Sequence, residues 1–382
     1  MRVDEVFQNV IALAHEFAAN RKERQKRTSL VQADFDRLRD AGFLLTGVPA
    51  ESGGLWENIE TSTRPVSELL RTLGRADSSV ALVSSMHPAV LSFWLAMPWH
   101  EEGPLRAQTL AVTETARSGA WWGTITSEPG SGGDIGKTKA QAIRDSDGAY
   151  RISGQKHFGS GSGITSYMIT TAVADDSDEA DWFYIDVRDA KWDGSTGMKL
   201  LAPWDGHGMA ATQSHSFLFE GYPAKRYARA GQMREAAAAA GAFVGCLFTA
   251  VVLGIVQAAV EAAREQLQGK LESLRAYERV EWVNSSTDAW TIEQVYERML
   301  TSVEQAGSAA LPDVLRGKTA SAWLAESALT GICRVIGGGT LSRNSPFGFW
   351  FEDVRALGFL RPPWGLAYDQ LMDASLPEQE LV

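Results

Sequence analysis

Ala236–Val260 is a run of 25 residues without one charged side chain, and it limits the possible folds more than any other segment. A run of this length can cross a bilayer as a helix. Its apolarity comes largely from Ala and Gly, however, and it contains Thr249 and Gln257 and leads directly into a charged helix expected at Glu261–Arg279. These features favour a helix buried inside a helical bundle over a helix inserted into a membrane.

Helical periodicity marks both ends of the chain. In the first third, the expected helices are Val6–Glu16, Ser29–Leu45 with a Ser cap, Pro65–Gly74 and Ser78–Ala96. In the last third, they are Ala236–Leu267, Trp290–Ala306 and Pro312–Ile336. These patterns are packing signals and predict no chemistry by themselves.

Between Trp121 and Arg226 the sequence has short runs of β-branched and aromatic residues, separated by Gly, Asp and Ser clusters. The expected strands are Trp122–Ile125, Ala149–Ile152, Tyr167–Val173 and Trp182–Val187. This texture predicts a compact β domain with hairpins rather than alternating βαβ units. A chain of 382 residues exceeds what one core usually spans, so we expect a helical domain at 1–119, a β domain at 120–228 and a helical domain at 229–382.

Composition argues against several classes of function. The net charge is −11 and there is no Lys/Arg cluster, so the chain is poorly suited to neutralise the phosphates of a nucleic acid. Cys246 and Cys333 lie far apart in apolar stretches and predict neither a disulfide nor a metal site. Acidic residues interrupt Met1–Phe17, which therefore does not resemble a signal peptide, and we expect a cytoplasmic protein.

Thr124–Asp134 joins an expected strand to a Glu-Pro-Gly turn with further glycines. The hydroxyls of Thr126 and Ser127 can hydrogen-bond the polar edge of a ligand, and Gly132 and Gly133 let backbone N–H groups approach it closely. The segment lacks the Lys-Ser/Thr ending of a phosphate-binding loop. Taken alone, it is also consistent with a simple hairpin loop.

Gly154–Gly163 is the second segment of the β domain with a chemical signature. Phe158 is flanked by small and hydroxyl residues, among them Ser160. An aromatic ring in this setting can stack on a flat ligand beside a hydrogen-bonding edge. The two segments together predict a seat for such a ligand.

Several short motifs follow one another in a fixed order along the chain. The central ones are Thr126-Ser127-Glu128-Pro129-Gly130-x-Gly132-x-Asp134 and Gly154-x-Lys156. Weaker ones are Leu38–Pro49 with Glu51–Gly54, Gly74–Leu82, Ile336–Gly339 and Phe351–Asp353. Each motif is weak alone, but in this collinear order the chain closely resembles the acyl-CoA dehydrogenase family over most of its length.

The resemblance implies a mainly α fold with a central β domain: an N-terminal helical domain, a β-barrel-like middle domain and a C-terminal four-helix bundle. It also implies a homo-oligomer, a dimer or tetramer, with FAD between the β domain and the C-terminal domain. Ser127 is then expected to hydrogen-bond the pyrimidine edge of the flavin, with Phe158 beside the ring and Ser160 near N5. Gly337 and Gly338 are expected to approach the adenosine end of the cofactor of a neighbouring subunit.

Two departures from the family pattern concern the catalytic base and the cofactor phosphates. In the family, a carboxylate removes the α-proton of an acyl thioester while hydride passes to flavin N5. The two family positions for this base fall here on Arg361-Pro362-Pro363 and on Phe243–Cys246, and a protonated Arg cannot act as a base. The pyrophosphate motif expected near Lys270–Leu274 is also missing, so FMN is an alternative to FAD.

Arg361 and His157 are the candidates for a catalytic role. Arg361 is a candidate for orienting an anion or a substrate; the alternative is a surface turn in which it pairs with Asp369 or Glu352. His157 could transfer protons next to a flavin, since an imidazole titrates near neutrality. Along a strand, however, His157 points to the face opposite Phe158, which favours a structural role.

Other histidines are expected to be structural. Asp205, His207 and His215 fit no standard metal-ligand spacing, so no metal site is expected. His87 lies in the apolar helix that begins at Ser78 and could face a substrate pocket. A satisfied core histidine, or a helix kink at Pro88, is the favoured interpretation.

Three functional hypotheses remain open. The first is a flavin-dependent oxidoreductase that transfers hydride between an acyl thioester, such as an acyl-CoA, and flavin N5, with an electron-transfer flavoprotein as partner. The second is a two-component monooxygenase that uses O2 and reduced flavin from a separate flavin reductase; Lys156–Gly161 resembles that branch of the superfamily. The third is a family member that has lost catalysis and acts as a binding subunit, which the intact set of Ser127, Phe158 and Ser160 disfavours.

Overall fold

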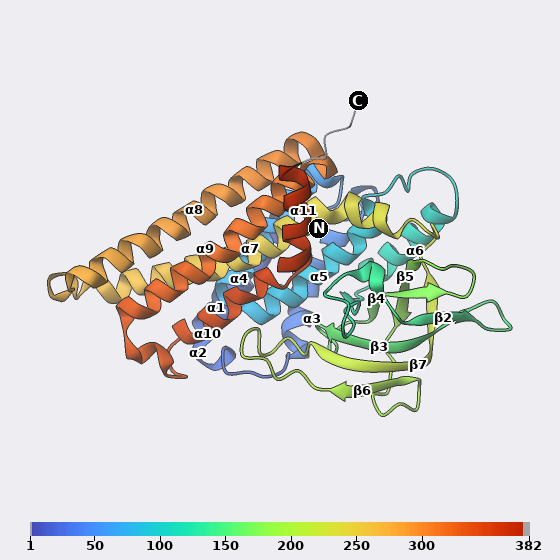
Figure 1. The fold of residues 1–382 in the computed structure, drawn as a ribbon, viewed down its shortest axis with the longest axis horizontal. Coiled ribbons are helices and arrows are strands. Elements are labelled where there is room, and N and C mark those ends of the chain that lie inside the picture. Colours follow the sequence, from blue (N-terminus) through green and yellow to red (C-terminus); the bar gives the residue numbers. More distant parts are fainter. Residues whose placement is uncertain (1, 377–382) are drawn as a thin grey trace.

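One seven-stranded sheet lies beside two helical regions in the computed structural model, which describes residues 2–376 (Figure 1). The first helical region contains α1 Val3–Ala19, α2 Arg21–Arg24, α3 Gln32–Asp40, α4 Ile59–Ala76, α5 Ser78–Leu95 and α6 Pro104–Arg117. The second contains α7 Met233–Gln268, α8 Ala276–Ala306, α9 Leu311–Ile336, α10 Phe347–Val354 and α11 Trp364–Ser375.

The strands between these regions form a barrel. They are β1 Trp122–Thr124, β2 Gln141–Arg144, β3 Tyr150–Gly159, β4 Tyr167–Ala174, β5 Ala180–Asp186, β6 Met198–Ala202 and β7 His215–Arg226. The order is β1-β4-β2-β3-β7-β5, and β5 also pairs with β4, so the strands from β4 to β5 close on themselves. Closure removes most sheet edges and encloses a separate apolar core that includes Ile152, Phe183 and Phe217. The predicted mainly α fold with a β-barrel-like middle domain is confirmed.

α7 is the central helix of the second helical region. It packs against α4, α5, α8 and α9, and Figure 1 shows α7, α8 and α9 running side by side. By length and composition, α5 and α7 could each cross a membrane, but 89% and 83% of their apolar windows are buried inside the structure. The uncharged run is therefore a core helix of a bundle, as its composition predicted.

The backbones of α4 and α7 meet at two glycines. A Cβ atom on Gly254 would overlap the carbonyl oxygen of Arg71, and one on Gly74 would overlap that of Val251. Because the obstacle is backbone on both sides, neither helix can yield by rotating a side chain. The crossing thus depends on the absence of side chains at these positions.

Replacing Gly254 with alanine is expected to lower the free energy of unfolding by about 1–3 kcal/mol, the usual cost of overpacking. Gly269→Ala is the matched control, because this glycine caps α7 at φ −80° and a Cβ there meets nothing within 4 Å. The control should be neutral or slightly stabilising. Urea denaturation of both variants measures the difference, and equal losses would contradict the close crossing.

Several element boundaries differ from the sequence predictions. The helix expected at Ser29–Leu45 is only α3, which begins after Val31 without a Ser cap, because Gly42 adopts φ 90° and a 3₁₀ turn follows. The charged helix expected at Glu261–Arg279 is two helices. α7 ends before Gly269, and Glu278 accepts a hydrogen bond from the Arg275 backbone N–H, which caps the start of α8.

Three strands were not predicted from the sequence. They are β2, β6 and β7. β7 contains Gly221 and Pro223, which signal turns, yet it pairs with β3, β5 and β6. Pairing with three neighbours outweighs the local signal, which only the folded barrel reveals.

Candidate functional site

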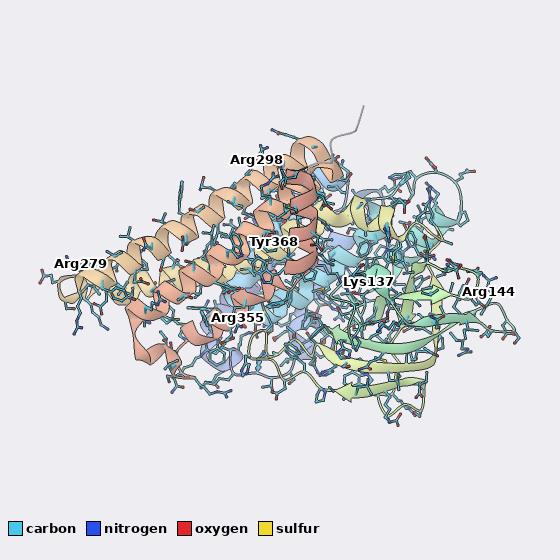
Figure 2. All side chains as sticks on the ribbon, in the orientation of Figure 1. Lys137, Arg144, Arg279, Arg298, Arg355 and Tyr368 are labelled. Carbon is cyan, nitrogen blue, oxygen red and sulfur yellow. The ribbon has the colours of Figure 1, made fainter. Side chains whose placement is uncertain are left out.

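A cavity of about 1110 Å³ lies where the β domain meets both helical regions. The side chains and backbone that line it come from α5, the Thr124–Gly136 segment, Phe158, Ser160, residues 204–214, the first half of α7 and the Glu352–Gln370 segment. In Figure 2, Arg355 marks the helical side of this junction and Lys137 marks the strand side. The structure therefore brings together segments that are more than 200 residues apart in the chain.

Most of the residues expected at the site line this cavity. They are Thr126, Ser127, Gly132, Gly133, Phe158, Ser160 and Arg361. Gly337 and Gly338 are not among the lining residues and lie at the end of α9, where Gly337 adopts φ 89°. Their predicted role concerns a neighbouring subunit and stays a prediction, as do the cofactor contacts of the other residues.

The glycine turn after β1 is shaped by local hydrogen bonds. The Gly133 N–H donates to Ser131 Oγ (3.2 Å), which donates to the Glu128 carbonyl (3.0 Å), and Asp134 Oδ1 accepts from the Gly136 N–H (2.9 Å). Gly132 and Gly133 adopt φ 62° and 84°, which favours glycine at both positions. The turn is therefore a built feature rather than a loose hairpin loop.

A buried ion pair lies under the same turn. Lys156 Nζ is 2.5 Å from Glu128 Oε1 and also donates to the Thr171 carbonyl, while Glu128 accepts from Thr138 Oγ1 and the Lys139 N–H. Burial lowers the pKa of Lys156 to about 8, against the opposing effect of Glu128. Burial acts to raise the pKa of Glu128, but the hydrogen bonds from Lys156 and Thr138 outweigh it and lower this pKa. Both groups are thus charged at neutral pH, and the pair ties β3 to the turn.

Phe158 and His157 do not follow the simple alternation of a strand. A register shift separates Lys156 from Gly159, and Phe158 adopts φ 58°. Phe158 is 55% exposed, lines the cavity and meets Trp204 edge to face at 6.1 Å. His157 is not among the lining residues, and its Nε2 lies 2.7 Å from the side-chain nitrogen of Gln155. The structure does not bring His157 to the cavity, which agrees with the structural interpretation.

Ser160 begins a short chain of buried hydroxyls. Its Oγ is 2.8 Å from Ser214 Oγ, which is 2.8 Å from Thr212 Oγ1, and Thr212 donates to the Met209 carbonyl. All three hydroxyl residues line the cavity. Because Thr212 donates to a carbonyl, Ser214 must donate to Thr212 and Ser160 to Ser214, so Ser160 Oγ presents a lone pair to a ligand.

Arg361 reaches across to the β domain. Its guanidinium donates to the Gly133 carbonyl (2.8 Å), Thr126 Oγ1 (2.7 Å) and Ser127 Oγ (3.3 Å). Burial lowers the pKa of Arg361 to about 10, against the opposing effect of Asp134, and the group stays charged at neutral pH. The alternative of a surface turn is wrong, because Glu352 pairs instead with Arg355 at 2.6 Å.

The wall formed by α5 and α7 is largely apolar and contains no carboxylate at the described lining positions. Its residues include Leu82, Met86, Val90, Val244 and Phe248. The carboxylates elsewhere on the lining all have partners: Glu128 with Lys156, Asp134 with the Gly136 N–H and Glu352 with Arg355. The family positions of the base are thus occupied by apolar residues and by Arg361.

His87 is a satisfied core histidine and does not line the cavity. Its Nε2 hydrogen-bonds the Leu44 carbonyl (3.0 Å), and its Nδ1 accepts from the Trp122 N–H (3.2 Å). Burial lowers the pKa of His87 to about 4, with an opposing effect of the Leu44 bond. The sequence-based preference for a structural role is confirmed.

Acid is expected to destabilise the protein through His87. Its pKa is lower in the folded state, about 4 against 6.5, so the unfolded state binds the proton more tightly. The free energy of unfolding should fall as pH drops from 6.5 to 4, by about 3 kcal/mol in total. Denaturation curves at several pH values for the wild type and His87→Gln measure this effect, and an unchanged slope in the variant would assign it to other groups.

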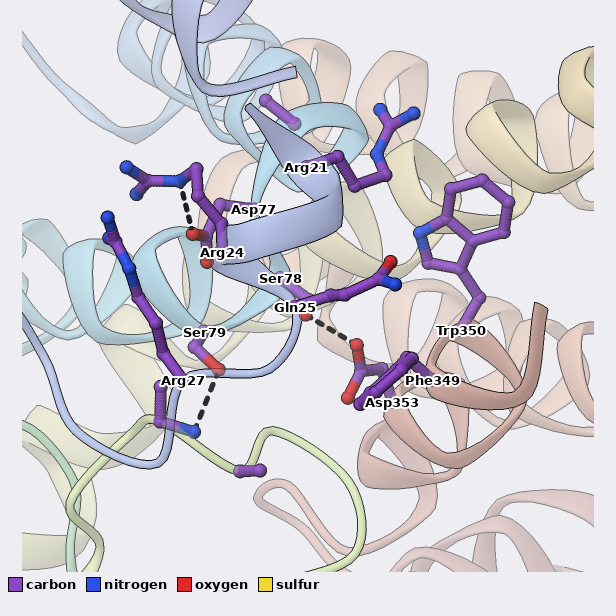
Figure 3. Close-up of a pocket in the computed structure, with 13 residues that line it drawn as sticks. Arg21, Arg24, Gln25, Arg27, Asp77, Ser78, Ser79, Phe349, Trp350 and Asp353 are labelled. Atoms are coloured by element: carbon purple, nitrogen blue, oxygen red, sulfur yellow. Dashed lines mark hydrogen bonds and ion pairs between the residues drawn. The ribbon is translucent and has the colours of Figure 1, made fainter. Parts of the chain in front are cut away.

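A second, small cavity lies at the start of α5 (Figure 3). Arg24 is buried there and bonds both Asp34 and Asp77, and Ser78 Oγ donates to the buried Asp353. The cavity volume is about 40 Å³, room for little more than a water molecule. This volume has no room for an organic ligand, and the bonds of Arg24 to Asp77 and of Ser78 to Asp353 tie α2 to α5 and α5 to α10.

The sequence does not reveal the role of four charged residues around the main cavity. Glu128 and Lys156 occur in separate motifs that give no sign of their pairing, and Lys318 on α9 belongs to no motif. Arg234 of α7 also lines the cavity and has no ion-pair partner in the part of the chain that the structure describes. A buried lysine at a helical position such as 318 has no sequence signal beyond its apolar surroundings.

Comparison with known proteins agrees with this geometry. Residues 123–222 match the family described as "Acyl-CoA dehydrogenase, middle domain". L-evernosamine nitrososynthase from Micromonospora sp. is 24% identical over 366 residues, which are 90% of this chain and 83% of that protein. A protein of Pseudomonas putida named "Probable FMNH2-dependent monooxygenase SfnC" is 27% identical over 298 residues, 75% of this chain and 67% of that protein.

A solved structure, KijD3 in complex with FMN and dTDP-3-amino-2,3,6-trideoxy-4-keto-3-methyl-D-glucose, has a TM-score of 0.82 with this chain. The sequences are 20% identical, and the match covers 98% of this chain and 93% of that one. The flavins in these names agree with the flavin chemistry expected from the sequence. The chain therefore contains an acyl-CoA dehydrogenase middle domain at residues 123–222 and shares its overall fold with KijD3.

Proposed function

We propose that this protein is a flavin-dependent monooxygenase that uses reduced FMN and O2 to oxygenate a small molecule. One observation carries the proposal. The cavity beside the flavin seat has apolar walls and Arg361 where the family keeps its base, and every carboxylate on the described lining is already bonded. The names of the nitrososynthase and of SfnC support the same class of reaction.

The residues present fit a flavin. A volume of about 1110 Å³ exceeds the roughly 300–1,000 Å³ of an ordinary small-molecule site, which leaves room for a second ligand. Thr126 and Ser127 would bind the polar edge of the ring, Phe158 would lie beside it and Ser160 would face its reactive part. When bound, reduced flavin supplies the electrons and reacts with O2.

The chain's own residues have three tasks in this scheme. The apolar wall of α5 and α7 excludes water from the ring and accommodates an apolar part of the substrate. The hydroxyl chain from Ser160 to Thr212 directs the Ser160 O–H toward Ser214, so that Ser160 Oγ can accept a hydrogen bond from the ring. The pair of Lys156 and Glu128 keeps the glycine turn and β3 in register, so the seat is preorganised.

FMN rather than FAD is the proposed cofactor. The family's pyrophosphate motif is absent near Lys270–Leu274, whereas Arg234 lines the cavity with its charge unpaired among the described residues. A single cation suits the one phosphate of FMN. A separate flavin reductase is the partner that this scheme needs, because each turnover oxidises the flavin, which must then be reduced again.

Dehydrogenation of an acyl thioester is less well supported. Removing an α-proton requires a carboxylate beside the ring, but on the described lining Glu128 and Glu352 are ion-paired, Asp134 caps the glycine turn, and neither family position of the base has a carboxylate. The non-catalytic hypothesis is disfavoured by the preserved seat, where six of the expected cofactor residues line one cavity.

Three measurements test the proposal: binding of reduced FMN, oxygenation of a substrate and the response of the flavin spectrum to an acyl-CoA. The purified protein should bind reduced FMN under anaerobic conditions and, when supplied with a flavin reductase, NADH and O2, should oxygenate an amine or sulfur compound. Addition of an acyl-CoA to protein with oxidised flavin should leave the flavin spectrum unchanged. Bleaching of the flavin by the acyl-CoA would favour the dehydrogenase instead.

A further inference from the structure

Lys318 is buried behind the segment that carries Arg361. Only 2% of Lys318 is exposed, and its Nζ donates to the Leu360 carbonyl (2.8 Å) and the Pro362 carbonyl (3.0 Å). These are the carbonyls on either side of Arg361. The ammonium therefore fixes the backbone immediately before and after this arginine.

The charge of Lys318 has no counter-ion among the described residues. Its contacts are carbonyl oxygens, and no carboxylate lies within ion-pair distance of it in the part of the chain that the structure describes. Burial lowers the pKa of Lys318 to about 8, so the ammonium stays protonated at neutral pH. A buried cation without a carboxylate is costly, and an apolar residue of the same length would pack here at lower cost.

The guanidinium of Arg361 is bound by the glycine turn, on the side opposite the backbone contacts of Lys318. Its guanidinium bonds Thr126, Ser127 and Gly133, and a Cβ on Gly133 would lie 2.6 Å from Pro363 Cγ, so turn and segment are in close contact. Like Lys318, Arg361 has no carboxylate within ion-pair distance among the described residues. Two buried positive charges thus lie behind the hydroxyls of the flavin seat, and Asp134 acts on Arg361 only from beyond ion-pair distance.

We infer that Lys318 is a positioning residue for Arg361 and that Arg361, held in this way, makes the seat select the anionic, reduced form of the flavin. This inference rests on the proposed function. Reduced flavin is an anion once the ring nitrogen N1 has lost its proton, whereas the oxidised ring is neutral. The phosphate has the same charge in oxidised and reduced FMN. The difference between their affinities therefore reports the charge of the ring alone.

The test uses the dissociation constants of oxidised and reduced FMN, measured by anaerobic fluorescence titration. Arg361→Met should weaken binding of reduced FMN by about 10- to 100-fold, the range for a lost charge-assisted hydrogen bond, and affect oxidised FMN far less. Lys318→Met should act in the same direction. The double variant should bind reduced FMN no more weakly than Arg361→Met alone, because Lys318 acts only through Arg361.

Two further variants control the experiment. Lys318→Arg keeps the charge and should retain more of the preference for reduced FMN than Lys318→Met. Lys225→Met removes an exposed charge from β7, outside the cavity, and should change neither constant. Thermal unfolding checks that each variant folds; if Lys318→Met does not fold, Arg361→Met still tests the selection of the anion.

Three results would overturn the inference. If Arg361→Met lost the same affinity for oxidised and for reduced FMN, the guanidinium would not distinguish the charge of the ring. Losses that multiply in the double variant would show that Lys318 acts independently of Arg361. These first two results leave the proposed function intact. The third result, a wild-type protein that binds neither form of FMN, would contradict the proposed function and the inference together.

Discussion

Replacing Lys156 with methionine is expected to lower the free energy of unfolding by about 3–5 kcal/mol, the cost of leaving one member of a buried pair without its partner. Lys156 is fully buried, and the side chain of its partner Glu128 is 4% exposed. The methionine side chain has about the same length as lysine but no charge. The Glu128 carboxylate then keeps only its hydrogen bonds from Thr138 and two backbone N–H groups. Urea denaturation monitored by circular dichroism measures the loss.

The double variant Lys156→Met/Glu128→Gln is the control for this prediction. It removes both charges, and the amide oxygen can still accept from the Lys139 N–H. We expect it to be more stable than Lys156→Met, since an unpaired charge costs more than an absent pair. If the single and double variants are equally unstable, packing rather than charge explains the loss.

Replacing Gly133 with alanine is expected to lower the free energy of unfolding by about 2–5 kcal/mol, which combines backbone strain with overpacking. Gly133 adopts φ 84°, and its new Cβ would lie 2.6 Å from Pro363 Cγ. Relief of this overlap pushes the segment of Arg361 away from the turn. Affinity for reduced FMN should therefore fall together with stability.

Gly132→Ala is the matched control, because Gly132 has φ 62° but a Cβ there meets nothing within 4 Å. It should show only the strain, about 1–3 kcal/mol. The difference between the two variants, in thermal stability and in the dissociation constant of reduced FMN, measures the contact with Pro363. Identical behaviour would mean that the turn does not support the Arg361 segment.

Local patterns were sufficient where a feature depends on neighbours in the chain. The uncharged run of Ala236–Val260 could be stable only when buried, and it became the core of α7. The glycine-rich turn required positive φ values and hydroxyl neighbours, and both could be read from the order Thr126 to Asp134. β7 could not be found in this way, because its turn-forming residues are held extended by partners distant in the sequence.

The sequence by itself determined the three-part order of helices, β domain and helices, the segments proposed as the flavin seat and the absence of a carboxylate at the positions that correspond to the family's base. These depend on hydrophobic periodicity, on glycine and on the identity of single residues. Only the tertiary structure determined which charged side chains lie beside these segments. Arg361 donates to Thr126 across 235 positions of the chain, and Lys318 holds the carbonyls beside it from another helix. Contacts of this kind leave no periodic signal, because their energy arises only when burial removes the charges from water and brings distant partners within hydrogen-bonding distance.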